Sequence, residues 1–215
     1  MKVITVSVGK PQIVQPQPET YVSTAIYKTP VAGRVRVGQL NLEGDAQADL
    51  TVHGGWSKAV YVYPGEHYEF WRNEYPEMLL GDSQFGENLT TEGLLETEVF
   101  IGDRLRIGSA EFVVTEPRMP CYKLGIKFGR SDILRRFLQS RRSGFYLAVL
   151  KTGELEAGDP IEILYRDENR VSVTDIVRLY VEDKDDVETM RRAVKVESLP
   201  DGWKDAFQHR IDPNA

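Results

Sequence analysis

The single cysteine of the chain, Cys121, lies in a segment that suits thiolate chemistry. It stands between Arg118 and Lys123 and follows two prolines, Pro117 and Pro120. Nearby cations lower the pKa of a thiol, and the thiolate is the form that ligates metals or attacks electrophiles. A lone cysteine is more often a small buried side chain. The sequence therefore predicts either a reactive thiolate or a packing residue at position 121.

Two upstream segments have residue types that suit ligand binding. After His53, the pair Gly54 and Gly55 lets backbone N–H groups approach an anion closely. His53 is suited to donate to that ligand or to transfer a proton. Asn88 both donates and accepts, which suits recognition of a heterocycle or a phosphate. The structural alternatives are a glycine turn with a hydrogen-bonded histidine, and an Asx-turn at Asn88.

A lysine and a hydroxyl residue, Lys28 and Thr29, precede Pro30 and would together suit a phosphate. The alternative is a surface lysine in front of a proline turn. A pyridoxal-phosphate site on Lys28 or Lys123 is a further reading, although no surrounding motif favours it.

Several familiar site motifs are missing from the sequence. It has no Walker-type phosphate loop, no Gly-x-Gly-x-x-Gly, no Cys-x-x-Cys and no His-Glu-x-x-His. One thiolate without companions suits a metal whose other ligands come from an organic cofactor. No flavin, haem or nicotinamide signature is present, so a redox reaction would take its electrons from a separate donor protein.

Composition restricts the class of protein. The chain has 215 residues, 41% hydrophobic and 28% charged, and a formal net charge of −6. A nucleic-acid-binding protein needs a positive surface, so no stable nucleic-acid binding is expected. No apolar run approaches the roughly 18 residues of a membrane span. One cysteine and no secretory signal predict a soluble, cytoplasmic protein.

Short strands dominate the first two thirds of the sequence. Prolines 11, 16 and 18 predict a loop, and two helices are expected at 66–73 and 131–141. Strands are expected at 3–8, 59–63, 99–107, 111–115, 144–150 and 160–165. This pattern predicts a mainly β protein with some helix, folded as a closed or nearly closed β-barrel.

The sequence pattern changes near residue 168. Ser172 and Asp186 are suited to cap two helices, and Pro200 to open a third. Three such short helices cannot bury much core alone. They are expected to pack on the barrel, on each other or on a second subunit, which would make a homodimer. We therefore predict a domain at 1–168 and a three-helix domain at 169–215.

Three segments of the sequence stand out together. They are Gly-Asp-Ala-Gln-Ala-Asp at 44–49 with His-Gly-Gly at 53–55, Phe-Gly-Glu-Asn-Leu at 85–89, and Glu-Pro-Arg-Met-Pro-Cys-Tyr-Lys-Leu at 116–124. These segments resemble the MOSC domain family, in the order expected for it, and most closely its YiiM-like branch. The end of the chain after about residue 171 resembles the 3-alpha domain of that branch.

The resemblance implies a β-barrel, a molybdenum-pterin cofactor and Cys121 as the protein ligand of the metal. Lys28 and Thr29 resemble a Lys-Ser pair that meets the cofactor phosphate in related reductases. Arg142 lies in a segment like a Gly-Arg-x-Gly-Trp pattern of the branch, but Arg141 replaces its glycine and Phe145 its tryptophan.

Molybdenum-bearing relatives reduce N-hydroxylated compounds such as hydroxylaminopurine-like bases and amidoximes, which makes such a small molecule the expected substrate. Cys121 and His53 would then be the catalytic residues. Gly54, Gly55, Asn88, Arg118 and Lys123 would bind the cofactor. The family implies an alternative of another class, a carrier that holds sulfur as a persulfide on Cys121 or hands the cofactor to a partner.

Overall fold

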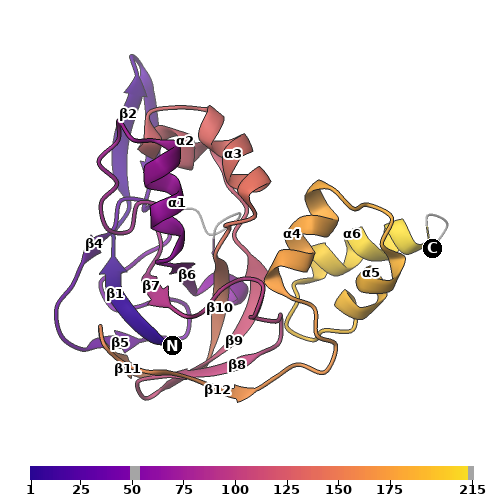
Figure 1. Ribbon diagram of the computed structural model, residues 1–215. Helices are drawn as coiled ribbons and strands as arrows, with labels where there is room; N and C mark the ends of the chain where they lie inside the picture. The colour runs from indigo at the N-terminus through magenta and orange to yellow at the C-terminus, as the bar shows by residue number, and fades with distance from the viewer. Residues whose placement is uncertain (49–53, 213–215) are drawn as a thin grey trace.

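The computed structural model describes residues 1–48 and 54–212, which form a large sheet with helices at one end and beside it (Figure 1). The helices in the described residues are η1 (Trp56–Lys58), α1 (His67–Glu74), α2 (Tyr122–Phe128), α3 (Asp132–Ser140), α4 (Val173–Val181), α5 (Val187–Ala193) and α6 (Asp201–Ile211). The strands are β1 (Lys2–Val8), β2 (Gln12–Gln17), β3 (Thr20–Thr24), β4 (Thr29–Pro30), β5 (Val35–Val37), β6 (Val60–Pro64), β7 (Leu89–Glu92), β8 (Arg104–Ile107), β9 (Ala110–Pro117), β10 (Phe145–Lys151), β11 (Gly153–Leu155) and β12 (Ile161–Tyr165).

The main sheet of the described chain has eight strands in the order β12-β8-β9-β10-β6-β7-β1-β4. All neighbours are antiparallel except β6 and β7, which run parallel. The start of β1 comes close to the start of β12, where Ile161 N donates to Met1 O at 3.1 Å and Lys2 forms an isolated bridge with Pro160. This sheet is open in its strand order, so the predicted closed barrel is not confirmed. The fold is a mixed α/β fold.

The predicted loop after β1 was wrong, because β2 and β3 pair as an antiparallel hairpin there. Its register shifts between Val14 and Gln17, around Pro16. Proline lacks an N–H donor and is tolerated at sheet edges and irregularities. Because this hairpin forms a two-stranded sheet of its own, Pro16 interrupts no central ladder.

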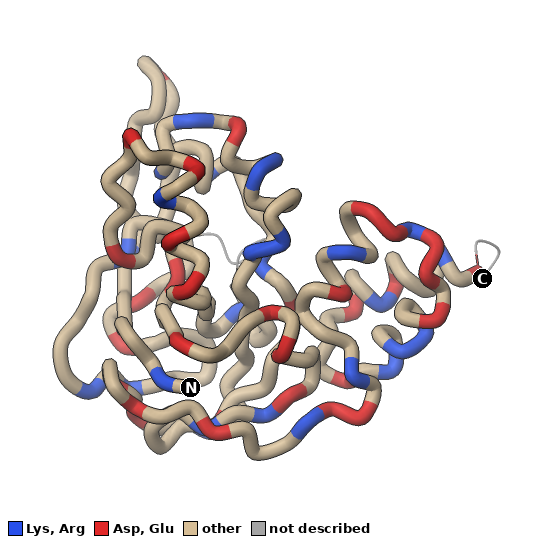
Figure 2. The backbone as a smooth tube through the Cα atoms, in the orientation of Figure 1, with Lys and Arg blue, Asp and Glu red and all other residues tan. Residues whose placement is uncertain are grey.

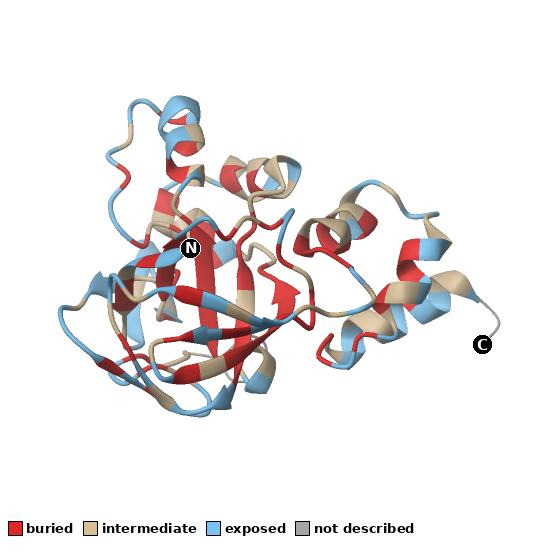
Figure 3. Cartoon of the chain, turned by 60° about the horizontal axis from the view of Figure 1, so that its bottom comes forward, coloured by how far each residue is buried: buried red, intermediate tan, exposed pale blue. Residues whose placement is uncertain are grey.

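Two buried clusters support the pocket described below. One is largely aromatic and lies among α1, α2, α3 and β6, with Trp71, Phe85 and Phe137 fully buried. The other fills the inside of the sheet and continues without a break into the C-terminal helices through Ile176 and Phe207. Figure 3 shows these buried residues along the central strands and on the inner faces of the helices.

The C-terminal helices begin where the sequence predicts. Ser172 and Asp175 form a complete capping box at α4, and the Asp186 side chain accepts from Thr189 N at α5. α4 packs against β9, so these short helices share the core of the sheet. The domain boundary near residue 168 stays a prediction, and it lies between β12 and α4.

Basic and acidic residues are interspersed along both the sheet and the C-terminal helices, as Figure 2 shows. In the described ranges, no helix is both long enough and apolar enough to cross a membrane.

Candidate functional site: a pocket beside Cys121

The pocket next to Cys121 is lined by segments that are far apart in the sequence. It comprises about 690 Å³ of space, including its mouth. Its lining residues come from the segment after β3, the stretch at 45–48, the end of η1, β6, the turn before β7, the end of β9, the start of α2, and β10. The strands bring these segments together because β6, β9 and β10 are hydrogen-bonded neighbours.

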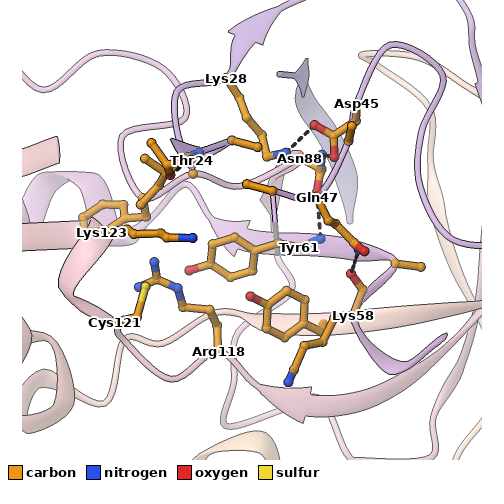
Figure 4. A pocket seen from close by; sticks show the side chains of 18 of the residues that line it. Thr24, Lys28, Asp45, Gln47, Lys58, Tyr61, Asn88, Arg118, Cys121 and Lys123 are labelled. Carbon is orange, nitrogen blue, oxygen red and sulfur yellow. Dashed lines mark hydrogen bonds and ion pairs between the residues drawn. The ribbon is translucent and has the colours of Figure 1, made fainter. Parts of the chain in front are cut away.

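On one side of the pocket, Asp45 joins Lys28 and Asn88. The Lys28 ammonium pairs with Asp45 Oδ1, which also accepts from Gly9 N at 2.8 Å. Asn88 Nδ2 donates to Asp45 Oδ2 at 2.9 Å, as the dashed lines in Figure 4 show. We call Lys28, Asp45 and Asn88 the clasp.

The side-chain amide of Asn88 makes three hydrogen bonds within the protein. Its Nδ2 also donates to Ser7 O at 3.2 Å, and its Oδ1 accepts from Tyr61 N at 3.1 Å. Its backbone pairs with Tyr61 and Ser7 as well. Both Nδ2 hydrogens and one of the two acceptor sites of Oδ1 are used in this way, so the protein holds the side chain in place. Asn88 therefore shapes the pocket wall.

Lys28 is a buried cation, with 8% of its side chain exposed. Burial lowers the pKa of Lys28, and the Asp45 carboxylate partly opposes that shift. The pairing offsets the cost of desolvating the charge. The ammonium is thus directed into the clasp.

The opposite side of the pocket holds Arg118, which is 5% exposed. Its guanidinium lies 5.5 Å from the centroid of the Tyr61 ring and 5.1 Å from that of Phe137. Its Nη1 is buried and makes no hydrogen bond to any described residue. Burial lowers the pKa of Arg118, but Tyr61, Tyr146 and Cys121 outweigh it and the net pKa is raised. Arg118 is therefore a permanent cation with an unused donor.

Cys121 and Lys123 complete this second side. Cys121 is partly exposed and precedes α2, where its carbonyl accepts from Leu124 N at 2.9 Å. Lys123 is 8% exposed and directs its amine toward the centre of the pocket (Figure 4). Figure 4 also shows the Arg118 guanidinium beside the Cys121 sulfur. We call Arg118, Cys121 and Lys123 the cationic wall. It would attract an anion to the thiol.

Two tyrosines lie between the clasp and the wall. The rings of Tyr61 and Tyr146 are 5.3 Å apart, and the Tyr61 hydroxyl donates to Ser143 O at 2.8 Å. Burial raises the pKa of Tyr146 to about 12, with Arg118 acting in the opposite direction. Burial raises the pKa of Tyr61 as well, so both hydroxyls stay protonated at neutral pH. No motif marks either tyrosine in the sequence, because both lie within ordinary strand patterns, those of β6 and β10.

The pocket brings together some of the predicted site residues and leaves others outside. Lys28, Asn88, Arg118, Cys121 and Lys123 line it. Thr29, Gly54, Gly55 and Arg142 are absent from its lining. The remaining candidate, His53, lies outside the described residues.

The outlying candidates have other surroundings. Thr29 is exposed on β4 and borders a separate cavity beyond Lys28. Gly55 precedes η1 and is exposed with a φ of 94°, a conformation that favours glycine. Arg142 stacks over Phe70 at 3.9 Å in a cavity between α1 and α3. These residues lie near motif positions in the sequence, but none of them lines the pocket beside Cys121.

Several lining residues had no predicted role. Two of them, Asp45 and Gln47, lie in the motif segment 44–49, and the others include Thr24, Lys58, Tyr61 and Tyr146. Across the described ranges, no group of three or more His, Cys, Asp or Glu side chains could hold a metal ion.

Comparisons with known proteins agree along the length of the chain. The model of the MOSC domain matches residues 49–162, and that of the YiiM-like, 3-alpha helix domain matches residues 171–212. YflK of Bacillus subtilis is 38% identical over 98% of this chain and 94% of its own length. The crystal structure of YiiM from Geobacillus stearothermophilus superposes with a TM-score of 0.81 at 32% identity and covers 98% of each chain.

A more distant relative is a protein named reductase from Gibberella moniliformis. It is 36% identical over 74% of this chain, and the match spans 28% of its own length.

Proposed function

The chain belongs to the MOSC domain family and carries the YiiM-like 3-alpha helix domain, and from this premise we propose that it is a molybdenum-cofactor-dependent reductase of N-hydroxylated compounds. The proposal rests on one observation: a partly exposed thiol lies beside buried cations on one wall of a pocket. The relative named reductase supports oxidoreductase chemistry in this family. The proposal includes three further predictions from the sequence. The sheet forms a barrel, the two domains divide at residue 168, and the protein is a homodimer.

The residues of the cationic wall fit a molybdenum-pterin cofactor. Such a cofactor is anionic and offers its own sulfur ligands, so it needs one further soft ligand and nearby positive charge. Cys121 is the soft ligand, and Arg118 Nη1 is a buried donor without a partner among the described residues. A buried guanidinium that lacks an acceptor costs free energy, which a bound anion would offset.

Lys123 and Arg118 would hold the anionic groups, while Cys121 would ligate the metal. The clasp would set the far wall, because Asp45 and Asn88 fix each other and Lys28 through their hydrogen bonds. Thr29 borders a different cavity, which Lys28 also lines, so a phosphate held by both residues would lie there.

When bound, the cofactor supplies the two electrons that break the N–O bond of the substrate. Tyr146, whose pKa is raised to about 12, keeps its proton and orients an oxygen by donating to it. The two protons that leave with that oxygen as water enter from solvent through the mouth of the pocket. His53 remains a predicted proton donor, and a separate protein would deliver the electrons.

The first test measures the molybdenum content of the protein. We expect the wild-type protein, expressed in a host that makes molybdopterin, to contain about one Mo per chain. Cys121→Ser replaces the soft ligand by a hard one and should reduce the Mo content about tenfold or more. The control is Ser109→Ala in the exposed turn between β8 and β9, which should keep full Mo. Equal Mo in wild type and Cys121→Ser would overturn the ligand role.

The partly exposed thiol beside cations also favours the carrier function. That function predicts a sulfane-sulfur adduct on Cys121 by mass spectrometry, and no turnover of hydroxylaminopurines or amidoximes with a chemical reductant. Turnover that disappears in Cys121→Ser would instead support the reductase.

A further inference from the structure

The thiol of Cys121 lies in a cationic part of the pocket. Among the described lining residues, four side chains are cations and one is a carboxylate, that of Asp45, which is paired with Lys28. The cations are Lys28, Lys58, Arg118 and Lys123. Cys121 itself is partly exposed. An anionic molecule that enters the pocket is therefore attracted toward the sulfur.

A buried donor beside the sulfur indicates that the ligand is an anion. Arg118 is 5% exposed, and its Nη1 makes no hydrogen bond to any described residue. Figure 4 shows the guanidinium next to the Cys121 sulfur and the Lys123 amine directed into the same space. Carboxylates accept charge-assisted hydrogen bonds from guanidinium and ammonium groups. A small molecule that carries a carboxylate would thus satisfy this donor while it meets the thiol.

The pocket has the size of a small-molecule site. It comprises about 690 Å³ including its mouth, and such sites typically measure about 300–1,000 Å³. The chain has one cysteine, so no second thiol of the same chain can form or reduce a disulfide with Cys121. A mixed disulfide formed in the pocket would therefore persist until a thiol from outside the chain reduces it.

We propose that Cys121 is a thiolation site for low-molecular-weight disulfides that carry carboxylates, which the cationic wall selects by charge. The Cys121 thiolate attacks one sulfur of the disulfide, so that a new S–S bond forms to Cys121 and the original S–S bond breaks. The departing thiolate takes the bonding electron pair and leaves through the mouth of the pocket. Cys121 is thereby oxidised and the departing thiol is reduced, so the exchange needs no other oxidant.

The adduct would lie against the cationic wall and occupy the sulfur. One consequence rests on the proposed function: thiolation would keep Cys121 from ligating molybdenum until a free thiol reduces the adduct. The thiolation itself concerns the cofactor-free protein and holds whether or not the protein catalyses a reduction.

The test compares two disulfides on the full-length, cofactor-free protein. Glutathione disulfide is anionic and 2-hydroxyethyl disulfide is neutral, and intact-protein mass spectrometry measures the rate of adduct formation with each. Each rate is divided by the rate of N-acetylcysteine amide, a free thiol, with the same disulfide. A cleft lined by one sign of charge raises encounter rates about tenfold or more, so wild type should favour the anionic disulfide by about that factor.

Two variants test whether the cationic wall causes this preference. Arg118→Met and Lys123→Met each remove one cation and should lower the anionic-to-neutral ratio about three- to tenfold. The ratio isolates the effect of charge, because a change in the thiol itself alters both rates alike. The matched control is Arg142→Met, which removes a guanidinium outside the pocket and should leave the ratio unchanged. If one wall variant does not fold, the other decides the question.

Three results would overturn the inference. They are a wild-type protein that forms no adduct, a wild-type ratio near one, and a ratio that the wall variants leave unchanged. A protein that forms the adduct with the expected preference but binds no molybdenum would contradict the proposed function and support this inference.

Discussion

The two sides of the pocket differ in how completely their polar groups are satisfied. In the clasp, Asp45 accepts from Gly9, Lys28 and Asn88, and the side-chain amide of Asn88 makes three hydrogen bonds within the protein. On the cationic wall, the buried Arg118 Nη1 makes no hydrogen bond to the described chain. Both sides are rich in charge, so charge alone does not distinguish them.

This difference indicates which side of the pocket binds a ligand. A satisfied buried network holds the shape of a wall, and breaking it exposes several unpaired groups at once. An unsatisfied buried donor costs free energy until something accepts from it. We therefore expect changes in the clasp to affect folding, and changes in the wall to affect ligand binding.

The largest effect should come from Asn88→Ala in the clasp. It leaves Tyr61 N, Ser7 O and Asp45 Oδ2 without this partner, all of them buried. The free energy of unfolding should fall by about 2–4 kcal/mol. Urea denaturation at an unchanged m-value measures this loss. Asn73→Ala on the exposed face of α1 is the control and should change it by less than about 0.5 kcal/mol. A loss below about 1 kcal/mol for Asn88→Ala would show that the hydrogen bonds of the clasp do not stabilise the fold.

An intermediate effect is expected for Arg118→Met on the cationic wall. It removes a buried charge but keeps a side chain between Tyr61 and Phe137. The free energy of unfolding should change by less than about 1 kcal/mol, because removal of a desolvated charge offsets the loss of its hydrogen bond to Tyr146 and of its ring contacts. Mo per chain should fall about tenfold, as for the loss of one charge-assisted hydrogen bond.

Arg142→Met is the matched control for Arg118→Met, because its guanidinium stacks on Phe70 outside the pocket. It should keep Mo within about twofold of wild type. Equal depletion by both variants would show that the structure assigns the two arginines to the wrong roles.

The smallest effect is on the pH dependence of stability, and it comes from a lysine near the clasp. Lys127 donates to Ile26 O at 3.0 Å and to Ser83 O at 2.5 Å. Burial lowers the pKa of Lys127 from its ordinary 10.5 to about 8, which Glu87 opposes and Lys28 and Arg118 reinforce. Between these values the unfolded chain binds more protons than the folded one. The contribution of Lys127 to stability therefore rises from pH 8 to pH 10.5 and is lost as pH falls to 8.

Lys127→Met removes this dependence. Urea titrations at each pH measure the unfolding free energy of both proteins. As pH is raised from 7.5 to 9.5, the unfolding free energy of wild type should increase relative to that of the variant. Lys184→Met, at an exposed position, should give a curve parallel to wild type. Parallel curves for Lys127→Met would mean that this lysine titrates as a solvated one.

Much of the fold could be predicted because its signals are local. Strands β1 and β6, the β8–β9 hairpin, helix α3 and the caps of α4 and α5 follow from alternation, turn residues and capping side chains a few positions apart. Helix α2 was missed, since it has seven residues and carries Gly125 in its middle. The hairpin of β2 and β3 was missed because its prolines indicate a loop when the pairing partner is unknown.

The family, the thiol and the two cations beside it could be predicted from the sequence, because Arg118, Cys121 and Lys123 lie within one short segment. Which polar residues already have hydrogen-bond partners depends on the folded chain. The bonds of Asn88 reach partners 27, 43 and 81 positions away, and Trp203 meets Glu116 across 87. Whether a buried donor has an acceptor depends on such long-range contacts. For that reason only the fold could show that Asn88 supports the pocket, that Arg142 lies outside it, and that Arg118 retains a donor for a ligand.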